Sequence, residues 1–180
     1  MSQLIVLGFR DRCRAAEVLN DLKRRDLDWV ADLDHAVVVT RDEHGRTKVQ
    51  LSVDLSMGET IAWAALWGSL LSVTLFRSTE LMTQATDGIS AASVTGIIGA
   101  SVKYKFPDSS WWKKDIGLGD LFMRDVAALV KDGSSAIFML LHTYEGLVVR
   151  RELQNYGNLI VHASLSASQD RKINELFALT

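Results

Sequence analysis

Three segments of this chain are apolar without the alternation that a half-exposed β-strand shows. They are residues 4–7 (LIVL), 36–39 (AVVV) and 137–141 (IFMLL). Short runs of such side chains favour strands, and strands that are apolar on both sides are typical of sheets buried on both faces. Burying one of these side chains contributes roughly 1.5–3 kcal/mol, and a whole face left in water would invite aggregation. The sequence therefore predicts a sheet with both faces covered.

The residues leave three sources open for the second cover. It is a second copy of the protein, an apolar segment of the same chain that folds back, or the last helix acting as a lid. We favour the second copy, so the expected partner is the protein itself in a homo-oligomer.

Hydrophobic periodicity divides most of the chain into short strands and amphipathic helices. Strands are predicted over residues 4–9, 34–40, 47–53, 136–141 and 159–165, and helices over 11–27, 118–129, 144–155 and from a cap at Ser168 onward. The turn at residues 42–45, with Gly45 suited to positive φ, joins two strands into a hairpin. This order predicts an α+β protein with a ferredoxin-like βαββαβ core and an added β-hairpin.

The middle of the chain has a different character. Residues 60–76 and 88–102 carry no charge, and the polar residues 77–87 separate them. We interpret residues 56–114 as an apolar helical-hairpin insertion within a core formed by residues 1–55 and 115–180. A helix over residues 60–76 would be about 26 Å long, which is short of the roughly 30 Å of a bilayer core.

Large aromatic and small residues in this insertion suit close packing between protein subunits as well as contact with lipid. Trp63 and Trp67, four residues apart, share one helical face. The residues predicted to contact a partner or a membrane are Trp63, Trp67, Leu70, Leu71, Phe76, Gly96, Gly99, Trp111 and Trp112.

Composition excludes several classes of function. The 180 residues carry a formal net charge of −2 with no dominant basic stripe, so nucleic-acid binding is not expected. The single cysteine, Cys13, excludes a disulfide framework and is expected to be a small buried residue. The start of the chain has no signal-peptide pattern, which indicates a cytoplasmic location or the inner face of a membrane.

No motif for catalysis or for a cofactor is present. The chain lacks a P-loop, a dinucleotide-binding glycine loop and a His-Glu-x-x-His sequence. The predicted sheet would bring His35 and His142 together, with Asp34 or Asp32 near them, which leaves a metal or proton site open. We nevertheless expect these histidines to be strand-end residues, and the protein to be no enzyme, with no cofactor and no metal. Ser134 and Ser135 are expected to be polar residues that lead from a loop into a strand.

Three segments carry a resemblance to a known family. They are residues 34–42 (DHAVVVTRD), 133–138 (GSSAIF) and 163–166 (ASLS). In these segments the chain resembles the bacterial family called domain of unknown function 1269, which is often labelled predicted membrane protein. The family brings no catalytic residue, and the insertion here departs from its pattern, with fewer glycines, more tryptophan and the polar break at residues 77–87.

These observations favour a non-enzymatic protein that self-associates through its apolar insertion. Two other functions remain open: a membrane-associated protein anchored by the helical hairpin, and a domain that binds a small ligand or a metal.

Overall fold

The computed structural model describes residues 2–25, 33, 36–45, 47–51, 67, 70, 116–142, 146–157 and 159–178. Within these residues the chain is an α+β protein. The strands are β1 (Gln3–Phe9), β2 (Val37–Arg41), β3 (Thr47–Leu51), β4 (Ser135–Leu141) and β5 (Leu159–Ser164). The helices are α1 (Arg14–Lys23), α6 (Asp120–Leu129), α7 (Gly146–Gln154) and α8 (Ala167–Ala178).

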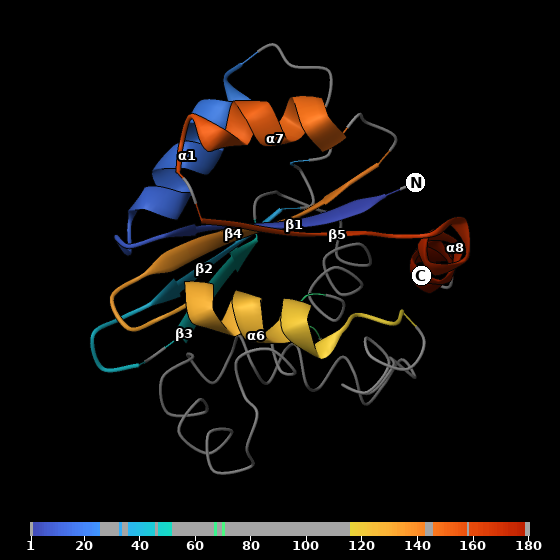
Figure 1. The fold of residues 1–180 in the computed structure, drawn as a ribbon. Coiled ribbons are helices and arrows are strands. Elements are labelled where there is room, and N and C mark those ends of the chain that lie inside the picture. The colour runs from blue at the N-terminus through green and yellow to red at the C-terminus, as the bar shows by residue number, and fades with distance from the viewer. Residues whose placement is uncertain are drawn as a thin grey trace.

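The five strands form one antiparallel sheet in the order β3-β2-β4-β1-β5. Strand β4 lies in the centre, where Val6 of β1 and Val37 of β2 both lie opposite Phe138. The chain therefore pairs its first and last strands, β1 and β5, which are far apart in sequence, and places Leu4 opposite Ala163. Helices α1 and α7 lie on one side of the sheet and α6 on the other (Figure 1).

The predicted hairpin between β2 and β3 is confirmed, since the two strands pair antiparallel from Val37↔Leu51 to Arg41↔Thr47. Its turn uses Gly45 at φ 77°, a conformation that side chains other than glycine rarely adopt. The Asp42 carboxylate accepts the His44 N–H at 2.9 Å, and the Asp42 carbonyl accepts the Gly45 N–H at 3.1 Å. The turn is therefore closed by local hydrogen bonds of the kind that Asp favours.

Helix α1 begins later than the sequence predicts, because the Asp11 side chain caps it from outside. The Asp11 Oδ1 atom accepts the N–H groups of Cys13 at 2.7 Å and Arg14 at 3.1 Å. The Ala15 N–H is bonded at 3.1 Å to the hydroxyl of Ser135, which opens β4. The first N–H groups of a helix have no partner within it. These three contacts satisfy the N–H groups here and fix the start of the helix at Arg14.

The first face of the sheet is covered by α1 and α7. Ile5, Leu7, Ile137 and Met139 point to this face and pack against buried side chains of the two helices. The helices contribute Ala15, Val18, Leu19, Leu22, Val149 and Leu153. The spacing of these residues gives each helix a single apolar stripe, as predicted.

The second face of the sheet is covered by other parts of the same chain, which corrects our expectation that a second copy covers it. Leu4, Val6, Val39 and Phe138 pack there against α6, with Trp67, Leu70, Ile116 and Ile173 completing the cover. The end of α6 approaches β1 closely, since a Cβ added to Gly8 would lie 3.0 Å from the Leu129 Cβ atom. Burial of the sheet therefore gives no reason of its own for self-association.

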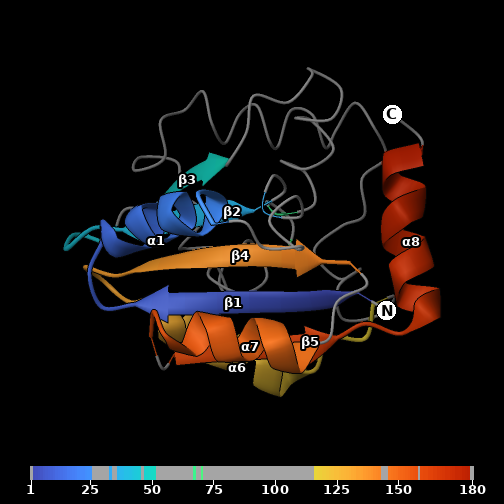
Figure 2. The same ribbon diagram turned by 90° about the horizontal axis from the view of Figure 1, so that it is seen from above.

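Helix α8 lies at the end of the sheet where the N-terminus begins, and runs across the strand direction (Figure 2). Its cap is Ser166 rather than the predicted Ser168: the Ser166 hydroxyl accepts the Gln169 N–H at 3.3 Å, and the Gln169 side chain accepts the Ser166 N–H at 2.6 Å. This reciprocal pair is a capping box. The Ser2 hydroxyl also donates to Asp170, at 2.5 Å, which ties the start of the chain to α8. Ile173 of this helix is fully buried.

Candidate functional site

Two of the residues that the sequence assigned to a partner or membrane contact are described, and both lie in the core of their own chain. Trp67 is 1% exposed and Leu70 is 0% exposed. The Trp67 ring meets Phe138 of β4 edge-on, with ring centroids 6.0 Å apart. These two side chains therefore do not offer a surface to a partner or to lipid in this conformation. The other residues of that set lie outside the described residues: Trp63, Leu71, Phe76, Gly96, Gly99, Trp111 and Trp112.

The pairing that would bring His35 close to His142 is present, since β2 and β4 are antiparallel neighbours. His142 is half-buried just after β4, whereas Asp32, Asp34 and His35 lie outside the described residues. Among the residues with a described placement, no three His, Cys, Asp or Glu side chains form a group that could hold a metal ion.

Cys13 is exposed and precedes the first residue of α1, which corrects the expectation of a buried thiol. A helix that began at residue 11 would include Cys13. In the structure Asp11 instead accepts the Arg14 N–H as a cap, and the helix begins at Arg14. The thiol therefore lies in water beside the cap.

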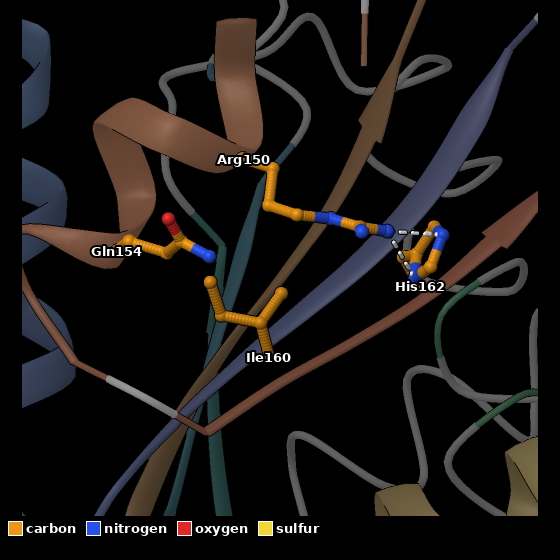
Figure 3. A pocket seen from close by; sticks show the side chains of 4 residues that line it. All are labelled: Arg150, Gln154, Ile160 and His162. Carbon is orange, nitrogen blue, oxygen red and sulfur yellow. Dashed lines mark hydrogen bonds between the residues drawn. The ribbon is translucent and has the colours of Figure 1, made fainter. Parts of the chain in front are cut away.

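An open pocket of about 410 Å³ lies where α7 passes over β5. Arg150 and Gln154 of α7 and Ile160 and His162 of β5 line it, and their side chains converge from the two elements (Figure 3). Arg150 and Gln154 are one helical turn apart, and Ile160 and His162 are two positions apart on a strand. Each pair therefore shares a face of its own element.

The Arg150 guanidinium lies against the His162 imidazole, with its Nη2 atom 2.8 Å from Nδ1 and in contact with Nε2 as well. A guanidinium has no acceptor, so this contact requires a ring nitrogen of His162 that carries no proton. Burial lowers the pKa of His162 below its ordinary value of 6.5, and the Arg150 charge lowers it further. Both effects favour the neutral imidazole at pH 7.

Replacing Arg150 should raise the pKa of His162 only part of the way to its ordinary value, because burial, the larger cause, remains. We expect the Arg150→Gln variant to shift the titration of the His162 ring protons, followed by NMR, to higher pH.

Because the folded protein holds the His162 proton more weakly than the unfolded chain does, this histidine's contribution to stability is lost as pH falls from 6.5 toward its folded pKa. Urea unfolding of wild type and His162→Gln across this range should show the loss in wild type alone; equal pH dependence would contradict it.

The sequence prediction missed all four pocket residues, although their spacing was visible in it. The intervals 150–154 and 160–162 place two pairs on predicted faces, but only the sheet order brings those faces together. Within a sequence, a lone arginine on a helix and a lone histidine on a strand are ordinary surface residues.

A second charged cluster joins the outer surfaces of α1 and α7. Tyr156 donates to Asp21 at 2.5 Å, and Arg25 lies over the Tyr156 ring and 3.7 Å from Glu152. Burial and the hydrogen bond to Asp21 raise the pKa of Tyr156. These groups satisfy one another, so the cluster is a tie between two helices and contributes little to stability where it is exposed.

Strand β5 is the edge strand beside this pocket. It pairs with β1 on one side, and within the described residues no strand pairs with its other side. Its sequence, LIVHAS, contains no Lys, Arg, Asp, Glu or Pro, whereas the opposite edge, β3, carries the exposed Lys48. Proteins commonly protect edge strands with such residues, so β5 is the less protected edge of the sheet.

Within the described residues the chain is an α+β protein with a five-stranded antiparallel sheet and an open pocket at one edge. The chain belongs to the family described as Protein of unknown function (DUF1269), whose family model matches residues 61–178. The match includes residues 133–138 and 163–166, which carried the resemblance in the sequence, but not residues 34–42. No curated protein and no solved structure matches the chain.

None of the helices within the described residues is both long enough and apolar enough to cross a bilayer.

Proposed function

We propose that this chain is a non-enzymatic protein that associates with a second copy of itself through the open edge of strand β5. The observation that carries the proposal is the six-residue edge strand without charge or proline. The backbone N–H and C=O groups along such an edge are free to pair with another strand. Two β5 strands related by a two-fold axis would be antiparallel, and each edge would then complement the other.

Apolar side chains along this edge support the same proposal. Leu159, the first residue of β5, is 38% exposed. Val161 and Ala163 are only partly buried by their own chain. A second copy would remove part of this apolar surface from water, which is the main favourable term in protein association.

The proposed seam differs from the one that the sequence suggested. Self-association was expected to use the insertion at residues 56–114, but Trp67 and Leu70 from that range belong to the core. We therefore assign assembly to β5 and propose that the start of the insertion serves to close the second face of the sheet.

We also propose that the fold is of the ferredoxin-like type. The strands β5-β1-β4-β2 are consecutive in the sheet and antiparallel. Helix α1 lies between β1 and β2 in the chain, and α7 lies between β4 and β5. That order is the βαββαβ arrangement, with β3 and α6 added between its second and third strands.

A charge placed on β5 should weaken the assembly. In the Leu159→Lys variant, a lysine on each copy would have to lose water for the edges to pair, so we expect self-association to weaken about tenfold or more. Light scattering over a dilution series measures this directly. The matched control is Leu121→Lys on α6, where the leucine is 66% exposed and lies on another element. Its assembly should equal that of wild type.

Three results would contradict the proposal. If wild type is a monomer by light scattering at every concentration, the protein has no self-association interface at β5. Dissociation by Leu121→Lys, with Leu159→Lys unaffected, would move the seam to α6. Protein that is recovered only with detergent would support the competing proposal of membrane association through the helical insertion.

A further inference from the structure

We propose that the pocket formed by Arg150, Gln154, Ile160 and His162 binds the carboxylate of a small organic acid whose apolar part rests on Ile160. The proposal concerns a ligand site and does not depend on self-association at β5. It is built on which groups line the pocket and on how the Arg150 charge is partnered.

Arg150 is half-buried, and within the described part of the chain its contacts are those with the His162 ring. None of the carboxylates with a described placement forms an ion pair with it, in contrast to Arg14, Arg25 and Arg41, which lie against Glu17, Asp21 and Asp132. A guanidinium presents paired N–H donors whose spacing matches the two oxygens of a carboxylate. The pocket therefore holds a cation whose natural counter-charge is supplied by no described side chain.

The other lining residues narrow the ligand. Gln154 offers an amide N–H₂ donor and the neutral His162 ring offers one N–H donor, so the polar side of the pocket contains a single formal charge. One positive charge beside neutral donors suits a singly charged carboxylate better than a doubly charged phosphate. Ile160 supplies an apolar surface for an alkyl group, and a volume of about 410 Å³ falls in the range of small-molecule sites.

The contact between Arg150 and His162 also allows ligand binding to be detected through the His162 ring. A carboxylate that takes the guanidinium N–H groups would compete with the unprotonated nitrogen of His162 for the same donors. Binding should therefore change the environment of the imidazole, and the ring protons of His162 should report it by NMR.

The test titrates hexanoate, hexanamide and inorganic phosphate into the full chain and follows the ring signals of His162. We expect a saturable shift with hexanoate and none with hexanamide, which has the same alkyl chain without the charge. Phosphate should bind more weakly than hexanoate. A calorimetric titration gives the affinities independently of the signal.

Two variants separate the site from general binding. Arg150→Gln should weaken hexanoate binding about tenfold to a hundredfold, as expected for a lost charged hydrogen bond. Arg151→Gln changes the neighbouring, exposed arginine of α7, which does not line the pocket, and should bind as wild type does.

Each contrary result overturns the proposal. Equal binding by Arg150→Gln and wild type would show that Arg150 is not the ligand's partner. Phosphate binding as tight as hexanoate binding would show that Ile160 and the alkyl chain contribute nothing. No saturable shift with hexanoate in wild type would show that the pocket is only a surface depression.

Discussion

Replacing Trp67 with alanine should destabilise the protein by about 3–5 kcal/mol, the range for deleting a buried large aromatic side chain. Trp67 is 1% exposed and packs edge-on against Phe138, itself fully buried in the central strand β4. The deletion would leave a cavity between the sheet and the segments that cover its second face. Urea unfolding of wild type and Trp67→Ala measures the loss, provided that the slopes of the two transitions agree.

Urea unfolding together with light scattering decides between two roles for this residue. If Trp67 served a partner or a membrane, its removal would weaken assembly and leave the unfolding free energy of the chain nearly unchanged. If Trp67 belongs to the core, its removal lowers the free energy of unfolding, and the protein that remains folded assembles as wild type does. Leu70→Ala, at a site with no exposure, should follow Trp67→Ala with a loss of about 2–5 kcal/mol. Leu121→Ala on the surface should change stability by no more than about 0.5 kcal/mol.

The sheet could be predicted from the sequence because its signals are local. The runs at residues 4–7, 36–39 and 137–141 are strands in the structure or border them, and each contributes to both buried faces. Gly45 marked the hairpin turn because few other residues adopt its φ of 77°. The helix ends were less accurate, since the caps at Asp11 and Ser166 depend on side-chain contacts that periodicity does not contain.

What covers the second face could not be predicted, because that cover comes from sequence-distant pieces. Trp67, Ile116, Val126 and Ile173 meet in one cluster although they lie in three separate segments of the chain. Their apolar character was plain in the sequence, but an apolar helix face looks the same whether it packs on its own sheet or on a partner. The pocket at α7 and β5 was missed for a similar reason, since it depends on β5 lying at the edge beside β1.

Ser135 shows how a residue that looks incidental in the sequence holds two elements together. The sequence indicated only a polar residue leading into a strand. In the structure Ser135 is fully buried, and its hydroxyl donates to the Asp11 carbonyl at 2.5 Å and accepts the Ala15 N–H at 3.1 Å. One hydroxyl thus satisfies an acceptor before α1 and a donor within its first turn, and fixes the start of the helix on β4.

Replacing Ser135 with alanine should therefore remove both of these hydrogen bonds at once. The Ala15 N–H is buried, and leaving such a group without its hydrogen bond costs about 1–3 kcal/mol, so we expect Ser135→Ala to destabilise the protein by about 2 kcal/mol in urea unfolding. The adjacent Ser134 is the matched control: its hydroxyl donates to the Lys131 carbonyl, which also accepts the Ser134 N–H at 3.1 Å, and lies a longer 3.3 Å from the Leu129 carbonyl. Ser134→Ala leaves that carbonyl bonded and should cost no more than about 1.5 kcal/mol. Equal losses in the two variants, or a smaller loss for Ser135→Ala, would contradict the role assigned to Ser135, because both substitutions remove the same atom from neighbouring buried positions.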